Sequence, residues 1–173
     1  MTSTIPYEVP QKVGDIEIRK YSALVLATVD TNGNDNSAFS PLFAYISGKN
    51  IANSAIPMTS PVITSTKIPM TSPVVSDATT MSFVMPAGKT LDEIPEPLDS
   101  NVRIIPVPER EVAVLRFKGK TREKDVAAKE ALLRKALKDA GIEPVGEVFL
   151  MRYNPPWTPG FLRHNELGLE IKR

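Results

Sequence analysis

Hydrophobic and polar residues alternate along several stretches of the chain, and this alternation predicts strands. The segment "DIEIRKYSALVLATVD" (15–30) carries Ile16 and Ile18 and then Leu24, Leu26 and Ala27, and the turn-forming "DTNGND" ends it, so one or two strands are expected. Further strands are predicted in "TTMSFVMP" (79–86), "VRIIPVPEREVAVLRFKG" (102–119, two strands divided near Pro108), "VGEVFLMRYNPP" (145–156) and "NELGLEIKR" (165–173). Residues 54–75 favour extended structure, and the proline-rich "AGKTLDEIPEPLDSN" (87–101) indicates a loop.

Two segments instead show helical spacing. Residues 36–50 place Phe39, Leu42, Phe43 and Ile46 on one side of a helix, with Pro41 expected in its first turn and Gly48 after its end. The second helix is predicted over "TREKDVAAKEALLRKALKDAG" (121–141), with Thr121 as its N-cap and Gly141 as its stop. Its expected buried stripe is Leu133, Ala136, Leu137 and Ala140.

The order of these elements is strand, helix, extended pair, and then the same order again. We therefore predict an α+β fold of two βαββ halves, roughly 1–100 and 101–173, packed around one antiparallel sheet or open barrel and flanked by two helices. A length of 173 residues favours a single domain over residues 1–173.

Composition narrows the functional classes. The chain has 21 Lys and Arg against 20 Asp and Glu, so no excess positive charge favours nucleic acid as a partner. It has no cysteine, which excludes disulfides, thiolate metal sites and a cysteine nucleophile. The N-terminus lacks the pattern of a signal peptide, and no run approaches the roughly 20 apolar residues of a membrane span. A soluble cytoplasmic protein with no membrane partner is expected.

The phrase "IPMTSPV" occurs twice, at 56–62 and at 68–74. Alternation places Ile56, Met58 and Val62 on one face of a strand, and Ile68, Met70 and Val74 on one face of another. The prolines would keep both elements short. The structural interpretation is two related strand-and-turn elements with methionine filling gaps in the core; a thioether pair for haem or copper is the functional alternative.

Eight short motifs together resemble one family over nearly the whole chain. The chain resembles the SOUL haem-binding proteins in the doubled "IPMTSPV" and in "IEIRKY" (16–21), "YISGKN" (45–50), "MSFVMPAG" (81–88), "IPEP" (94–97), "VAVLRFKG" (112–119), "RYNPPWTP" (152–159) and "RHNE" (163–166). The resemblance implies a distorted β-barrel flanked by two helices, similar to the GyrI-like effector-binding domains. It also implies binding of haem or another tetrapyrrole (porphyrin) in an apolar groove beside the first helix.

The resemblance points to particular residues for that groove. Phe39, Leu42, Phe43 and Ile46 would line it, although the same four residues can form the buried face of an amphipathic helix, and one helix cannot offer all four to both roles. Lys20 and Lys49 could pair with the ring propionates. Apolar contact alone, at roughly 25 cal/mol per Å², can supply micromolar affinity for such a ring.

His164 is the only histidine and hence the only imidazole that could ligate haem iron. It stands where the family usually has an arginine. Some family members ligate iron through a histidine in the first strand, but Lys20 occupies the matching position here. A polar residue in a structural turn is the alternative interpretation of His164.

The late motif also contains Arg163, Asn165 and Glu166, for which a buried network that fixes a turn, anchored by Trp157, is predicted. Glu166 beside His164 suggests an acid–base pair, but we expect the two side chains on opposite faces of a strand.

No known catalytic fingerprint occurs, and nothing in the sequence argues for an enzyme. The alternatives to a tetrapyrrole carrier are an effector-binding module with Glu166 or Glu147 deep in its groove, a hydrolase-like enzyme, and an interaction protein without a small ligand.

Overall fold

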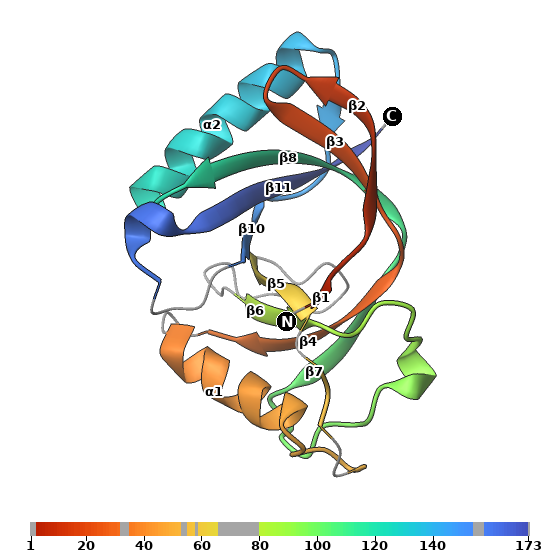
Figure 1. Cartoon of the computed structure of the whole chain (residues 1–173). Helices are drawn as coiled ribbons and strands as arrows, with labels where there is room; N and C mark the ends of the chain where they lie inside the picture. The colour runs from red at the N-terminus through yellow and green to blue at the C-terminus, as the bar shows by residue number, and fades with distance from the viewer. Residues whose placement is uncertain are drawn as a thin grey trace. The chain divides into compact units, whose positions relative to one another are not determined.

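The computed structural model describes residues 3–31, 35–52, 55–57, 59–65, 80–153 and 158–172. The chain folds into two compact units, and each unit is built from two separate stretches of sequence (Figure 1). The first unit comprises residues 1–6 and 23–108, and the second comprises residues 7–22 and 109–173.

The first unit is a mainly antiparallel sheet with one helix, α1, packed on it. Its strands lie in the order β5, β6, β4, β7, and the short β1 pairs in parallel with β5. The elements are β1 (Ser3–Thr4), β4 (Leu24–Asp30), α1 (Asp35–Ile46), β5 (Thr59–Ser65), β6 (Thr80–Val84), the 3-10 turn η1 (Leu91–Glu93) and β7 (Arg103–Val107).

The second unit repeats this plan with the helix α2. Its antiparallel strands lie in the order β2, β3, β8, β11, β10, and β9 pairs with the C-terminal end of β11. The elements are β2 (Tyr7–Val13), β3 (Ile16–Tyr21), β8 (Arg110–Lys118), α2 (Glu123–Asp139), β9 (Glu143–Pro144), β10 (Phe149–Arg152), the 3-10 turn η2 (Gly160–Leu162) and β11 (His164–Lys172). The predicted α+β class is confirmed.

The two units exchange one strand each. β3 precedes β4 in the sequence but pairs with β8, whereas β7 precedes β8 but pairs with β4. The βαββ order is present in both units, as β4-α1-β5-β6 and β8-α2-β10-β11. The predicted boundary near residue 100 is wrong, because residues 7–22 belong to the second unit and residues 101–108 to the first.

Both predicted helices form, with corrections at their ends. Pro41 lies inside α1 and not in its first turn, so α1 lacks one backbone hydrogen bond there, because proline has no N–H to donate. α2 is capped at Arg122 and not at Thr121, because the Asp125 carboxylate accepts hydrogen bonds from the Arg122 backbone N–H at 3.3 Å and from its Nε at 2.8 Å.

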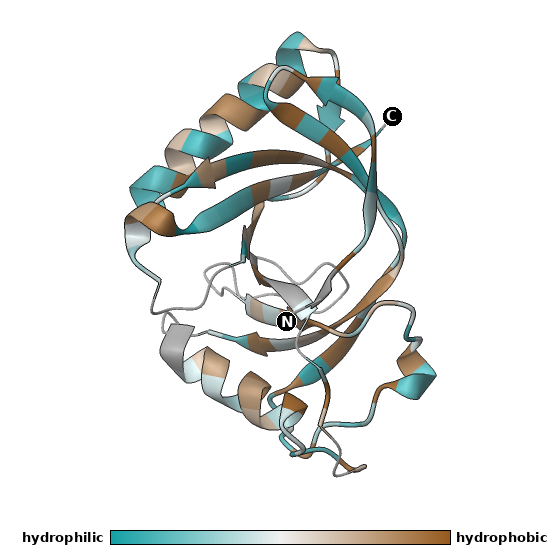
Figure 2. Cartoon of the chain, viewed as in Figure 1, coloured by the Kyte–Doolittle hydropathy of each residue, from teal (hydrophilic) through white to brown (hydrophobic). Residues whose placement is uncertain are grey.

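Each helix buries one side on its own sheet. α1 contributes Ala38, Leu42, Tyr45 and Ile46 to a core with alternate residues of β4, and Leu133 and Leu137 of α2 pack on Ile16 and Ile18 of β3 and Leu167 and Leu169 of β11. Ala136 is partly buried as predicted, but Ala140 is exposed. Hydrophobic and hydrophilic turns alternate along α2 in Figure 2.

The predicted strands form where alternation is clear. β2 is missing from the prediction, since all but the last of its residues are exposed and no buried face marks it in the sequence. In the first copy of the doubled phrase, Ile56 and Val62 pack against the α1 core, while Met58 lies outside the described residues. The second copy, residues 68–74, also lies outside them.

Candidate functional site

The four apolar candidates on α1 fall into two groups. Leu42 and Ile46 are fully buried in the core of the first unit. Phe39 is partly buried and packs edge-on against Phe83 of β6, with 5.3 Å between ring centroids. Phe43 is 54% exposed. Of these four residues, therefore, only Phe43 presents most of its side chain to solvent.

Phe43 is supported from below by Phe39. The two rings are stacked, with centroids 5.9 Å apart and planes inclined by 17°. Because Phe39 packs in turn on the core residue Phe83, the exposed Phe43 ring is the outermost of a column of three aromatic side chains. The packing of Phe39 behind Phe43 thus favours a defined orientation of the one exposed ring.

The two candidate lysines lie in different units. Lys49 follows α1 in the first unit and is exposed; among the described residues, none forms an ion pair with it. Lys20 lies on β3 of the second unit, where its Nζ is 3.4 Å from the Glu109 carboxylate across an exposed pair. Lys49 is thus the candidate cation in the same unit as Phe43.

A pocket of about 550 Å³ also borders α1, and six of its eight lining residues are polar or charged. Asp30 and Arg103, which form an ion pair at 2.8 Å, lie on its wall. The remaining lining residues are Val29, Thr31, Ser37, Pro41, Ser100 and Asn101. None of the four predicted apolar residues contributes to it, so it is not the predicted groove.

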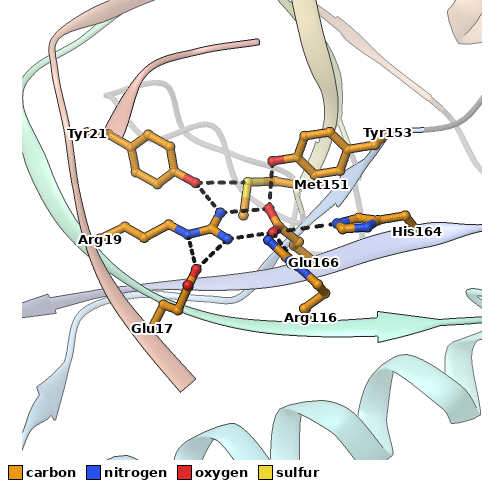
Figure 3. Close-up of polar contacts among 8 residues, drawn as sticks. All are labelled: Glu17, Arg19, Tyr21, Arg116, Met151, Tyr153, His164 and Glu166. Carbon is orange, nitrogen blue, oxygen red and sulfur yellow. Dashed lines mark hydrogen bonds and ion pairs between the residues drawn. The ribbon is translucent and has the colours of Figure 1, made fainter. Parts of the chain in front are cut away.

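The second unit contains a buried charged cluster on the face of its sheet opposite α2. On β3, Ile16 and Ile18 point toward the core under α2, so the alternate residues Glu17, Arg19 and Tyr21 point to the other face. Arg19 is only 1% exposed. Figure 3 shows its guanidinium between the carboxylates of Glu17 and Glu166.

Arg19 uses all five of its N–H donors. Two bonds reach Glu166, from Nη1 at 2.7 Å and from Nη2 at 2.6 Å. Nε and Nη2 donate to one Glu17 oxygen at 2.9 and 2.7 Å, and Nη1 also donates to the Tyr21 hydroxyl at 2.8 Å. The Tyr7 ring lies under the guanidinium at 4.0 Å. These five hydrogen bonds offset much of the free energy that the guanidinium loses when it is removed from water.

The Glu166 carboxylate is surrounded by donors. Besides Arg19, it accepts a hydrogen bond of 2.6 Å from the Tyr153 hydroxyl and one of 3.4 Å from Nε of Arg116. Nε2 of His164 lies 3.7 Å away (Figure 3). The expectation that His164 and Glu166 lie on opposite faces is wrong, since they are two positions apart on β11 and side chains two apart share a face.

The protonation states follow from these contacts. Burial alone would raise the pKa of Glu166, but the hydrogen bonds from Arg19 and Tyr153 outweigh it and hold that pKa below its usual value. Burial and the neighbouring Glu166 charge raise the pKa of Tyr153. Glu166 is therefore a firmly ionised carboxylate and a poor proton acceptor, which argues against an acid–base role with His164.

The predicted network of the late motif is confirmed in part. Asn165 donates from Nδ2 to the carbonyl of Gly119 at 2.9 Å, and Arg163 donates from Nε to the carbonyl of Thr158 at 2.9 Å. The arginine that binds Glu166, however, is Arg19 from the first predicted strand. Trp157 lies outside the described residues. Sequence reasoning missed Arg19, Tyr21 and Tyr153. No local signal singles out Arg19, because it is one of three charged residues in "IEIRKY" (16–21).

Comparison with known protein families gives a match to the SOUL heme-binding proteins over residues 2–170. The chain belongs to the SOUL heme-binding family. The predicted resemblance is confirmed. A comparison with curated protein sequences gives no match.

Solved structures with this fold have little sequence in common with the SOUL chain. The C-terminal domain of EcmrR is similar with a TM-score of 0.65 and 10% identity, over 96% of this chain and 98% of that one. A hydrolase encoded by lin2189 from Listeria innocua matches with a TM-score of 0.65 and 12% identity, over 91% and 92%. SAV2435 bound to tetraphenylphosphonium matches with a TM-score of 0.53 and 12% identity, over 97% and 94%. At these identities the likeness concerns the fold alone.

For a SOUL-family chain the question of a metal falls on His164. The described residues contain no cluster of three or more His, Asp or Glu side chains that could hold a metal ion. His164 is partly exposed, packs its ring edge on Tyr153 at 5.1 Å and directs Nε2 toward Glu166. No helix in the described parts of the chain is long and apolar enough to cross a membrane.

Two buried tyrosines of this SOUL protein, Tyr21 and Tyr45, have raised pKa values. Burial raises the pKa of Tyr21 to about 12, although the Arg19 bond opposes it, and burial raises the pKa of Tyr45 to about 12. A pKa raised in the folded state stabilises below the unfolded value, and this contribution is lost as the pH rises through about 12. Phenolate absorbance should show that Tyr21→Phe removes a late transition; ionisation of Tyr21 near its unfolded pKa while circular dichroism remains native would contradict this.

Proposed function

We propose that the protein binds haem or a related tetrapyrrole without catalysing a reaction, and that the flat face of the ring lies on Phe43 of α1. Two observations support this: the family to which the chain belongs, and the exposed Phe43 ring on its aromatic column. The exposed Phe43 ring is the reason for placing the ligand at α1, because a planar apolar ligand gains more binding free energy from an aromatic ring that is already oriented than from a mobile one.

The other apolar candidates take supporting roles in this proposal. Phe39 fixes the orientation of Phe43, and its partly buried edge can extend the contact. Leu42 and Ile46 belong to the core beneath α1 and shape the surface only through the position of the helix. The ligand thus rests on one edge of α1 and does not displace its buried side.

Lys49 is the better candidate partner for the propionates. It is exposed, lies three residues after the end of α1, and shares the first unit with Phe43. Lys20 already faces Glu109, so its charge is partly compensated. Each exposed ion pair of this kind contributes about 0–1 kcal/mol, so Lys49 adds selectivity for an anionic ring more than affinity.

The alternative functions lack a supporting observation of this kind. A cationic effector would need an acidic group that is not already neutralised, but Glu166 is bound by Arg19 and approached by Arg116. Glu147 is exposed and lies 3.7 Å from Arg134. A hydrolase would need a base, and the lowered pKa of Glu166 opposes that role.

A haemin titration followed by the Soret band tests the proposal. Phe43→Ala should weaken binding by about tenfold, because loss of a half-exposed aromatic contact is worth roughly 1–1.5 kcal/mol. Leu132→Ala is the matched control: Leu132 is also an exposed apolar residue on a helix, at 56%, and should leave the affinity unchanged. Lys49→Gln should weaken haemin more than an uncharged porphyrin.

The same titration with His164→Gln decides whether this histidine ligates iron. In the proposed site the Soret position and the affinity stay the same in this variant. If His164→Gln abolishes the Soret shift while Phe43→Ala has no effect, the ring lies in the second unit and the proposed location is wrong. Absence of saturable binding by the unaltered protein would reject the tetrapyrrole function itself.

A further inference from the structure

A projecting apolar turn in the second unit is used neither by the core nor by the proposed haem site. Phe161 and Leu162 lie next to each other on η2 and are 76% and 57% exposed. Phe161 is the most exposed of the large apolar side chains in the described residues. We propose that this turn docks the protein on the surface of a bilayer that contains anionic lipid.

The turn is held firmly in place although its side chains are not buried. Leu162 donates its backbone N–H to Pro159 at 2.9 Å, and Arg163 donates to Gly160 at 3.1 Å. Arg163 also donates from its side chain to Thr158, and its carbonyl accepts from Gly119 at 3.1 Å. Both apolar side chains are therefore displayed by a fixed backbone, which lowers the entropy lost when they insert elsewhere.

Basic residues flank the turn. Gly160 packs so closely on Lys120 that a Cβ there would lie 3.0 Å from Cγ of Lys120, so the Lys120 stem runs along the turn. Residues 118–125 contain four basic and two acidic residues, although the whole chain has a net charge of only +1. Lys120 and Lys124 are exposed. Figure 2 shows the hydrophobic turn beside the hydrophilic start of α2.

This combination fits a lipid surface better than a protein partner. A stable protein interface needs about 800 Å² on each side, which two side chains on a projecting turn cannot supply. A bilayer interface requires less: an aromatic and an aliphatic side chain inserted at the headgroup boundary, with lysines next to anionic headgroups. The absence of a long apolar segment excludes a spanning helix in the described residues but does not bear on this kind of surface binding.

Co-sedimentation with vesicles tests the proposal without haem, so its result is independent of the function proposed above. The probes are vesicles of phosphatidylcholine with phosphatidylserine, and vesicles of pure phosphatidylcholine. We expect binding to the anionic vesicles that weakens with salt, and a blue shift of the emission of Trp157, the only tryptophan, which lies four positions before Phe161 in the sequence. The double variant Phe161→Ser/Leu162→Ser should reduce the partition coefficient by roughly tenfold.

Matched variants separate the turn from general effects. Leu132→Ser/Val145→Ser alters two other exposed apolar residues of the second unit and should bind as the unaltered protein does. Lys120→Gln/Lys124→Gln should reduce binding by roughly tenfold, whereas Lys135→Gln/Lys138→Gln, with the same change in net charge at the other end of α2, should not.

Three outcomes would overturn the proposal. The first is no binding of the unaltered protein to anionic vesicles. The second is equal binding by the Phe161→Ser/Leu162→Ser variant. The third is self-association that this variant abolishes while vesicles are not bound, in which case the turn contacts a second copy of the chain.

Discussion

Replacing Arg19 by methionine lowers the free energy of unfolding by about 3–5 kcal/mol, the largest effect expected of any single substitution in this protein. The reason is the carboxylate left behind. Glu166 is as buried as Arg19, and after the substitution its only remaining charged partner among the described residues is Nε of Arg116 at 3.4 Å, with the His164 imidazole at 3.7 Å. A buried charge without its main partner is far more destabilising than the absence of the pair.

Urea unfolding of three variants tests this explanation. Arg103→Met makes the same substitution in an exposed ion pair, that of Arg103 with Asp30 at 2.8 Å, and should lower the free energy of unfolding by only about 0–1 kcal/mol. The double variant Arg19→Met/Glu166→Leu should recover most of the loss, because it removes both charges together. A loss below about 1 kcal/mol for Arg19→Met would show that water or a rearranged side chain replaces the guanidinium.

Replacing Gly168 by alanine lowers the free energy of unfolding by about 3 kcal/mol, the upper end of the range for overpacked cores. A Cβ at this position would lie 2.6 Å from two ring carbons of Phe149, its partner across β10 and β11, and 3.2 Å from Cε of Met151. Phe149 cannot move freely, since the Arg110 guanidinium lies 4.7 Å from its ring. The displacement would also reach Met151, whose sulfur accepts the Tyr21 hydroxyl at 3.9 Å.

Gly160→Ala is the matched control for this substitution. Neither glycine has a left-handed backbone, but a Cβ at Gly160 meets only the flexible Lys120 side chain, at 3.0 Å, so the expected change is below about 0.5 kcal/mol. Gly168→Ala in a Phe149→Leu background should be less harmful than in the native chain, because the smaller side chain leaves space for the methyl group. Equal losses in both backgrounds would place the cause outside the Phe149 contact.

The sequence contains the information for one half of the candidate site. Helical spacing correctly groups Phe39, Leu42, Phe43 and Ile46 on α1, because residues three and four apart must share a side of a helix. It cannot tell which of the four is exposed, since that depends on how α1 is rotated over β4 and β6. Leu42 and Ile46 are buried against the sheet, whereas Phe43 is exposed to solvent.

The other half depends on long-range pairing. Arg19 and Glu166 are 147 positions apart, and no local pattern connects them. They meet because β3 pairs with β8 instead of continuing beside β4, and β8 pairs with β11. A prediction that keeps β3 in the first half of the chain therefore separates the two charges, and it assigns Glu166 to the wrong arginine.

By itself, the sequence determined the α+β class, the two helices, most of the strands and membership of the SOUL family, because each of these follows from local periodicity or from short motifs in a fixed order. The tertiary structure alone decided the exchange of β3 and β7, the five-bond environment of Arg19, and the exposure of Phe43 and Phe161. The physical reason is that the spacing of hydrophobic residues along the sequence fixes only the face of its element on which each side chain lies. Its partner and its burial are set by strands brought together from distant parts of the chain.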